Sequence, residues 1–194
     1  MVALPGIRAF AFHTDLDRIR DAFRASMSAI DERRRQAVEA HQLYMDSGED
    51  DSEYDQDGVL VSSTRHALQW AELDASLAPI VVRQAFVTSA FHYWERSARA
   101  WTGFHGNGFP SLRERVEALG YAVSEELDLL NTLNNLLKHD NPEKGRKVFV
   151  KRSSLFLGGR EPAGGSWQSA LRITDDDVEH FFDIVRASGP AAAT

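Results

Sequence analysis

The stretch that decides the fold is Pro79-Ile-Val-Val-Arg-Gln-Ala-Phe-Val-Thr-Ser-Ala-Phe-His-Tyr-Trp-Glu-Arg-Ser-Ala-Arg-Ala-Trp-Thr102. Its apolar residues recur at three- and four-residue steps, which is the period of an α-helix. One row holds Val82, Phe86, Ala90, Tyr93 and Ser97, and the adjacent row holds Val87, Phe91, Trp94, Ala98 and Trp101. A helix that is apolar over so wide an arc belongs at the centre of a bundle. We therefore predict a helix over residues 79–102, with Pro79 in its first turn, as the core element.

Two further helices are predicted before this stretch. The three- and four-residue spacing of apolar residues from Leu16 onwards indicates a helix over residues 14–44, preceded by a strand or an arm at residues 1–13. Residues 46–58 contain seven acidic residues among thirteen, so we expect a loop or a disordered linker there. Residues 60–77 form the second predicted helix, which Pro79 should interrupt.

Three helices are predicted after the core stretch. The glycines of residues 103–108 indicate a loop, and the next helix is short, capped by Ser111 and ended by Gly120. Ser124 should cap a helix that runs to His139 and stops before Pro142. Thr174 should cap the last helix, which carries an apolar face of phenylalanines and branched residues.

Between the last two helices the apolar period changes from that of a helix to two. Val148, Val150, Leu155 and Leu157 alternate with polar residues, which predicts strands at residues 147–151 and 155–157 and a third at 169–173. The fold class we predict is therefore mainly α, a helical bundle with a small β-hairpin insertion before the last helix. We expect an N-terminal long helix and acidic linker at 1–58, the bundle at 59–187 and a disordered tail at 188–194.

Composition restricts the classes of function. The chain has 194 residues, 43% of them hydrophobic, which is enough for one real core. It has no cysteine, so disulfides, thiolate zinc sites and cysteine nucleophiles are excluded. The seven histidines show no helical pair spacing, so we expect no metal and no cofactor. The N-terminal residues do not have the pattern of a signal peptide, and no 18-residue apolar run occurs, so we expect a soluble cytoplasmic protein without a membrane partner.

Charge is distributed unevenly along the chain. The net charge of −7 argues against a purely electrostatic nucleic-acid binder. Residues 138–160, however, carry seven basic residues against two acidic ones, a local net charge of +5, and the other residues then hold −12. The basic residues are Lys138, Lys144, Arg146, Lys147, Lys151, Arg152 and Arg160. This segment is the candidate surface for an anionic partner such as RNA.

A polar stripe ends at the start of this basic segment. Asn131, Asn135 and His139 are spaced four residues apart and so share one face of the predicted helix. An imidazole at a helix C-terminus feels the negative carbonyl ends, while the neighbouring basic residues oppose its protonation. A histidine under these opposing influences suits proton transfer near neutral pH, for example in metal-independent RNA cleavage. A lone helical histidine is more often a packed or surface residue, so both interpretations stay open.

Three segments together resemble the HEPN superfamily of small helical bundles, which occurs in prokaryotic toxin–antitoxin, abortive-infection and CRISPR-linked proteins. They are Phe91-His-Tyr-Trp-Glu95-Arg-Ser, Leu133-Asn-Asn-Leu-Leu-Lys-His139 and Leu171-Arg-Ile-Thr-Asp-Asp-Asp-Val-Glu-His-Phe-Phe182. The resemblance covers roughly residues 79–187. It implies a homodimer whose Arg and His residues form a composite ribonuclease site across the interface, and it allows for a neutralising partner protein.

The family motif is an Arg, a polar residue, a short spacer and a His. Here His139 matches the His and Asn135 the polar residue, but Asn134 occupies the Arg position. Asn134 brings no charge to a phosphate, so another cation must replace the Arg or this member does not cleave RNA. The candidate substitutes are Lys138, Arg96 and Arg99, and we expect Glu95 and Asn131 to support the site. The family's modifiable Tyr, two residues after the His, is replaced by Asn141.

Two functions follow as hypotheses. The first is a HEPN-like, RNA-engaging protein of a defence or toxin system, either a metal-independent endoribonuclease or a catalytically weakened relative. Its catalytic residues would be His139, Asn134 and Asn135, and Lys138, Lys144, Arg146, Lys147, Lys151 and Arg152 would bind RNA. The second is a non-enzymatic, dimeric helical module that holds a partner protein on the apolar face of residues 79–102 or on the first helix.

Overall fold

The computed structural model describes residues 5–191. These residues form six α-helices and two short strands, in the order α1 (Pro5–Ser47), β1 (Glu53–Tyr54), β2 (Leu60–Ser62), α2 (Thr64–Thr102), α3 (Phe109–Ala118), α4 (Leu127–His139), α5 (Pro142–Lys151) and α6 (Asp175–Arg186). Two 3-10 turns, Ser153–Leu155 and Leu157–Gly159, follow α5. The predicted class, a mainly α bundle with a small hairpin, is confirmed, although the hairpin lies elsewhere in the chain than expected.

The chain divides into two units. Residues 5–23 and 83–191, among those described, form the first, which we call the compact unit. Residues 24–82 form the second, which we call the hairpin unit. The expected boundary at residue 58 falls inside the hairpin unit, because the division runs through the long helices α1 and α2 rather than through the linker between them.

The hairpin unit consists of the C-terminal part of α1 and the N-terminal part of α2, joined by the β1–β2 hairpin. The strands are antiparallel, with Tyr54 paired to Leu60. His41 Nδ1 lies 2.7 Å from Glu72 Oε2, and Arg33 donates to Asp74 at 3.0 Å, so the two helices lie side by side. The acidic linker is thus partly ordered. The arm or strand expected at residues 1–13 is wrong for the described part, because α1 already begins at Pro5.

The interruption that we expected at Pro79 does not occur. α2 continues through this proline from Thr64 to Thr102. Proline removes one backbone hydrogen bond and disfavours a helix interior. Ala75 and Pro79 are both buried and lie one turn apart, so the buried face continues through the proline. Packing therefore outweighs the local helix propensity here.

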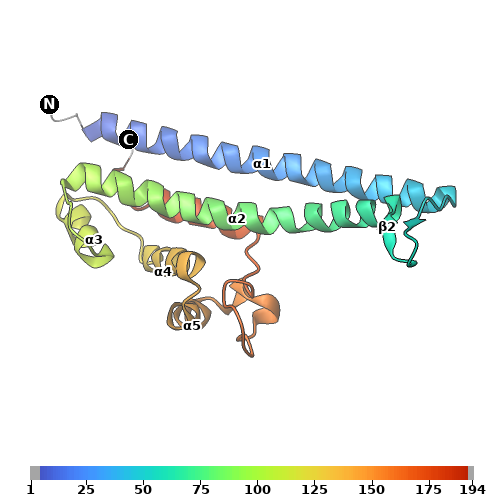
Figure 1. Cartoon of the computed structure of the whole chain (residues 1–194). Coiled ribbons are helices and arrows are strands. Elements are labelled where there is room, and N and C mark those ends of the chain that lie inside the picture. The colour runs from blue at the N-terminus through green and yellow to red at the C-terminus, as the bar shows by residue number, and fades with distance from the viewer. Residues whose placement is uncertain (1–4, 192–194) are drawn as a thin grey trace. The chain divides into compact units, whose positions relative to one another are not determined.

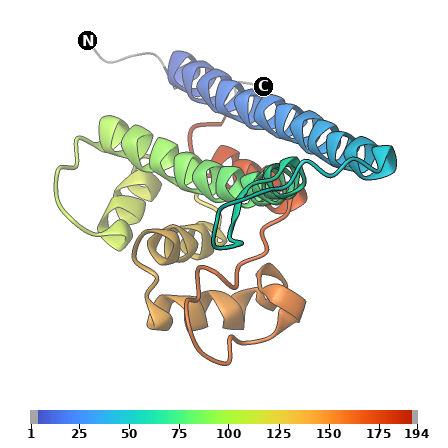
Figure 2. The ribbon, with the colours of Figure 1, turned by 45° about the vertical axis from the view of Figure 1, so that its right-hand side comes forward.

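The core of the compact unit forms around the C-terminal part of α2, as the apolar rows predicted. Val87, Trp94 and Ala98 are fully buried. In Figures 1 and 2 this part of α2 lies between the start of α1 and the helices α3 and α4. The Phe12 ring stacks on Tyr93 with 5.3 Å between centroids, and Phe23 lies at the same distance from Phe86.

The strands predicted at residues 147–151, 155–157 and 169–173 are wrong. Residues 142–151 form helix α5, with Asn141 as its N-cap accepting from the backbone N–H groups of Glu143 and Lys144. Val148 is fully buried, but Val150 is 78% exposed, so the alternation did not mark a sheet face. Of the predicted pairing there remains one isolated bridge between Phe156 and Leu171.

The expected helix ends are confirmed in part. Thr174 and Asp177 form a capping box at α6, and Gly120 follows α3 with φ of +81°. Ser111 does not cap α3, which begins at Phe109. Ser124 is not the N-cap of α4, which begins at Leu127, but its hydroxyl accepts from the backbone N–H of Glu126 at 3.3 Å in the turn before the helix.

The disordered tail that we expected at 188–194 is wrong for its first residues, and residues 192–194 lie outside the described part. The carbonyl oxygen of Ser188 accepts a hydrogen bond from Trp94 Nε1 at 2.5 Å, and its hydroxyl donates to the Ile184 carbonyl oxygen at 2.7 Å. These buried hydrogen bonds fix the chain after α6 against the core helix.

Candidate functional site

The predicted site lies on α4 and on the corner between α4 and α5. Leu127, Leu130 and Leu133 are fully buried and hold one face of α4 in the core. The helix ends at Asp140, which has φ of +44° and ψ of +44°. Its Oδ1 accepts from the backbone N–H of Gln168 at 2.8 Å, and this hydrogen bond is the main reason why the pKa of Asp140 lies below its ordinary value. The left-handed residue and this contact set the direction in which α5 leaves.

Of the two asparagines of the motif, Asn135 forms hydrogen bonds within α4 and Asn134 is buried. Asn135 Nδ2 donates to the Asn131 carbonyl oxygen at 2.9 Å and to Asn131 Oδ1 at 3.1 Å. Asn134, at the position of the family's Arg, is only 2% exposed. Its Oδ1 is buried without a hydrogen-bond partner in the described part of the chain. Asn134 therefore does not reach a ligand at the surface, because the helix turns it into the core.

His139 and Lys138 are both exposed at the last turn of α4. Neither forms a hydrogen bond or ion pair with the described residues, and neither lines one of the described surface hollows. His139 lies just before the basic helix α5 in the sequence. Among the described residues, no side chain is bonded to His139 as an acid–base partner.

The expected supporting residues on α2 belong to a different contact network. Arg99 donates to Glu95 at 2.9 Å and to the carbonyl oxygen of Gly106 at 2.9 Å, so it fastens the loop after α2. Burial raises the pKa of Glu95, but hydrogen bonds from Arg99 and His92 bring it below the ordinary value. Arg99 is thus unavailable as a replacement for the missing motif Arg. Arg96 is exposed and lies over the Tyr93 ring, 6.0 Å from its centroid.

The basic residues of the RNA-binding prediction divide into two groups. Arg152 donates to Asp177 at 2.7 Å and lies over the Phe181 ring, so it connects α5 to α6. Arg146 and Lys147 form exposed pairs with Glu161 and Glu143. Lys138 and Lys151 have no carboxylate partner among the described residues, and Lys144 interacts with Glu143 only at longer range. Exposed ion pairs contribute little stability and exchange readily, so α5 keeps a cationic surface.

That surface includes a hollow of about 410 Å³ beside α4. It is lined by Thr132, Glu143, Arg146, Lys147, Val150 and Lys151. Three cations surround one exposed valine here, and one carboxylate partly balances them. The arrangement can hold an anion, and the one hydroxyl in its lining, that of Thr132, donates to the Asp128 carbonyl oxygen at 2.7 Å.

The structure also shows a surface that our sequence analysis missed. Among the described residues, thirty hydrophobic residues are buried, and only Met27 and Ala75 of these belong to the hairpin unit. Of fifteen large hydrophobic residues that are exposed, ten belong to this unit. They are Val38, Leu43, Met45, Tyr54, Val59, Val61, Trp70, Leu73, Leu77 and Val81. The hairpin unit thus exposes more of its apolar residues than it buries.

Four of these residues form a continuous stripe on α2. Trp70, Leu73, Leu77 and Val81 are 70%, 46%, 50% and 66% exposed. At about 100° per residue they lie within roughly 80° of one another around the helix. Ala75 and Pro79, which are buried, lie on the opposite side. The signal was present in the sequence as a second apolar row, but the predicted break at Pro79 divided it.

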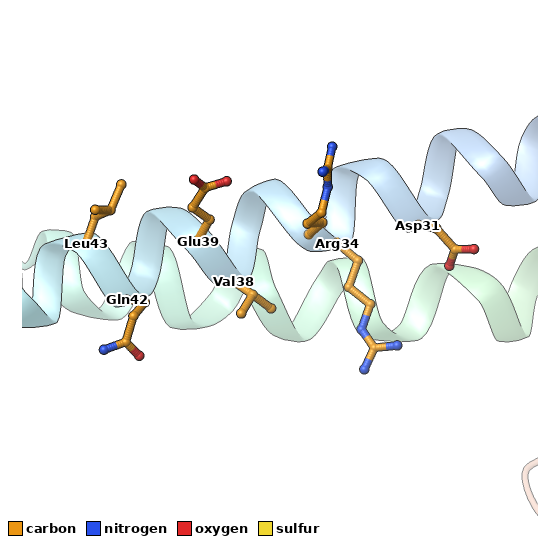
Figure 3. Close-up of a pocket in the computed structure, with 7 residues that line it drawn as sticks. Asp31, Arg34, Val38, Glu39, Gln42 and Leu43 are labelled. Carbon is orange, nitrogen blue, oxygen red and sulfur yellow. The ribbon is translucent and has the colours of Figure 1, made fainter.

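A shallow hollow of about 630 Å³ lies along α1 in the same unit. Figure 3 shows its lining residues, all of which come from α1. Val38 and Leu43 are surrounded by charged residues of both signs, Asp31, Arg34 and Glu39 among them. A hollow along a single helix with balanced charge is a surface feature rather than an enclosed ligand site.

A comparison with protein families, with curated proteins and with solved structures finds no match for this chain. Within residues 5–191, no helix is long and apolar enough to cross a membrane. No group of three or more His, Asp or Glu residues in the same range could hold a metal ion.

Proposed function

We propose that this protein is a non-enzymatic interaction module that pairs with a second copy of itself through the stripe Trp70, Leu73, Leu77 and Val81. The observation that carries this proposal is the surplus of exposed over buried apolar residues in the hairpin unit. Soluble monomers rarely leave large apolar patches uncovered, and such patches mark interaction surfaces. On this account the Asn134–His139 segment is structural.

The size and chemistry of the stripe fit a protein partner. Side chains of these types and exposures present on the order of 400 Å² of apolar surface, which is in the range of functional patches. Aromatic residues with aliphatic neighbours are enriched at the centres of interfaces. Asp74 is the one acidic residue beside the stripe on its outer face, and Arg33 already pairs with it. A charged ligand is therefore a poor match.

A second copy of the chain fits the pattern of residue sizes. An antiparallel pairing about an axis midway between Ala75 and Ser76 places Trp70 of one copy opposite Val81 of the other. Leu73 and Leu77 then meet at the centre. The largest residue faces the smallest, and the same patch serves both copies, as in a closed twofold dimer. This differs from the sequence-based hypothesis of a docking face over residues 79–102, where Val87, Phe91 and Trp94 are buried in the compact unit.

The test is the mass in solution of the wild type and of a Leu73→Glu/Leu77→Glu variant, measured by light scattering at about 50 μM. The wild type should be a dimer and the variant a monomer with unchanged helix content, because two buried charges destabilise the interface. Leu157→Glu is the matched control. Leu157 is 61% exposed but belongs to the compact unit, so this variant should remain a dimer. A wild type that has the mass of one chain would contradict the proposal.

A second candidate function, RNA binding in the manner of the HEPN superfamily, is favoured by one observation. Lys138 and Lys151 have no carboxylate partner in the described part of the chain, and Lys144 has only a longer-range interaction with Glu143, although the protein as a whole is acidic. If they hold a phosphate backbone, affinity for a single-stranded RNA should fall steeply between 50 and 200 mM salt. Lys144→Gln and Lys151→Gln should each weaken binding and lower the salt slope. RNA that does not bind even at 50 mM salt would exclude this candidate.

Cleavage is a separate question from binding. Asn134 is buried and Arg99 is occupied, so the remaining candidates for the missing cation are Lys138 and Arg96. Incubation of RNA with the wild type and with His139→Ala in EDTA shows whether the protein cleaves RNA as well as binding it. We expect no cleavage that depends on His139, and products with 2′,3′-cyclic phosphate ends from the wild type alone would show that this expectation is wrong.

A further inference from the structure

We propose that a groove between α1 and α2 in the compact unit binds a nucleotide-like ligand, in which a phosphate is joined to an aromatic base. The groove has a volume of about 510 Å³, which is within the range of small-molecule sites. None of its lining residues belongs to the stripe or to α5, and the inference does not depend on the dimer.

The groove has cationic walls and an aromatic floor. Arg18 from α1 and Arg96 from α2 line it, together with the imidazole of His92. Phe86, which is half-buried, supplies the accessible aromatic surface, whereas Tyr93 is buried and stacks on Phe12. No carboxylate lines the groove, although the chain carries a net charge of −7. A pocket with two guanidinium groups and no lining acid, in an acidic protein, favours an anionic ligand.

Both arginines can exchange their present contacts for a phosphate. Arg96 has no carboxylate partner among residues 5–191 and contacts only the face of Tyr93, at 6.0 Å from the centroid. Arg18 pairs with Asp15 at 2.7 Å, but the two side chains are 75% and 51% exposed. Such a surface pair contributes little and can be replaced. A guanidinium fork binds phosphate oxygens with two parallel hydrogen bonds, which a lysine cannot do.

The aromatic floor is held in place before any ligand arrives. Tyr93 donates its hydroxyl to the carbonyl oxygen of Phe12 at 2.8 Å, and the Phe86 ring packs against Phe23. The half-buried Phe86 ring can stack on a base without a large ordering cost. One arginine on each helix for the phosphate and the Phe86 ring for the base distinguish a nucleotide from inorganic phosphate or a simple carboxylate.

The same chemistry occurs in a free mononucleotide and at the 5′ end of an RNA. The experiment therefore titrates AMP, inorganic phosphate, a 5′-phosphorylated tetrauridine and its 5′-hydroxyl form into the full-length protein, followed by calorimetry. The proposal expects AMP or the 5′-phosphorylated RNA to bind at least tenfold more tightly than inorganic phosphate. Tight AMP binding identifies the free nucleotide, and a preference for the phosphorylated over the hydroxyl RNA identifies the RNA end.

Variants on the two facing helices test the location. Arg96→Gln and Arg18→Gln should each weaken binding about tenfold or more, and Arg96→Lys should recover only part of it. Arg115→Gln, on the exposed face of α3, is the matched control and should leave the affinity unchanged. The proposal is overturned if neither phosphate ligand binds, if both groove variants bind like the wild type, or if an acidic peptide binds with the same Arg96 dependence while AMP does not.

Discussion

Three buried or half-buried polar residues, His13, His41 and Asn134, have side-chain atoms without hydrogen-bond partners in the described part of the chain. His13 Nε2 is one of these atoms. Burial is the main reason why the pKa of His13 lies below its ordinary value of 6.5, and Arg186 lowers it further, against the opposing effect of Asp17. Folding thus disfavours protonation of this imidazole.

The first prediction concerns acid stability. Because the pKa of His13 is lower in the folded than in the unfolded chain, the unfolded state binds more protons between these two values. The free energy of unfolding should therefore fall as pH drops below about 6.5, the pKa of an unperturbed histidine. Urea unfolding at pH 7.5 and pH 5.0 measures this, and His13→Gln should lose less stability than the wild type over the same interval. Equal losses of stability in the two proteins would show that His13 does not contribute to the pH dependence of the free energy of unfolding.

The second prediction concerns the motif position. Asn134→Leu keeps the branched shape but removes a buried amide oxygen that lacks a partner, so stability should rise by about 1 kcal/mol. Thermal unfolding checks this against Asn135→Leu, which loses hydrogen bonds to Asn131 and should not be stabilised. A loss of stability in Asn134→Leu would show that its oxygen has a partner in solution. The sequence could place Asn134 on α4, but burial depends on the neighbouring helices, so it could not be predicted from spacing.

At the scale of elements, helices with a continuous apolar period were predictable. α4, α6 and the core part of α2 follow from their three- and four-residue repeats. α5 could not be recognised in this way, because its short sequence contains only one fully buried apolar residue, Val148, and its other packing position is Gly145. A glycine adds no apolar residue to the helical repeat, so the alternation of the neighbouring valines predicts a strand instead.

The third prediction follows from this glycine. A Cβ atom at Gly145 would lie 2.3 Å from Cδ2 of the buried Trp167 ring, too close for either group to remain in place. Gly145→Ala should therefore destabilise the protein by roughly 1–3 kcal/mol despite the better helix propensity of alanine. Lys144→Ala, one residue earlier in α5, should change stability by much less. Denaturant midpoints that are equal for both variants would mean that α5 does not pack on Trp167.

At the scale of the whole molecule, the two units differ in how many of their apolar residues are buried. The compact unit buries almost all of the core, which the sequence predicted from the apolar arc of residues 79–102. The hairpin unit buries only Met27 and Ala75 among the hydrophobic residues described and exposes a stripe instead. Its role could not be predicted from the sequence, because a single chain does not reveal which of two apolar rows is left without a partner. The account of function therefore depends on what covers Trp70.

The measurement that tests this central claim most directly is the dissociation constant of the dimer, from sedimentation equilibrium of the wild type and Trp70→Ala. The account predicts a wild-type mass of twice 21.7 kDa at high concentration. Trp70→Ala should weaken the dimer by about 30-fold or more, because Trp70 is the largest side chain of the stripe and a buried interfacial tryptophan typically contributes at least about 2 kcal/mol. A wild type that stays at 21.7 kDa at all concentrations, or a variant with an unchanged dissociation constant, would contradict it.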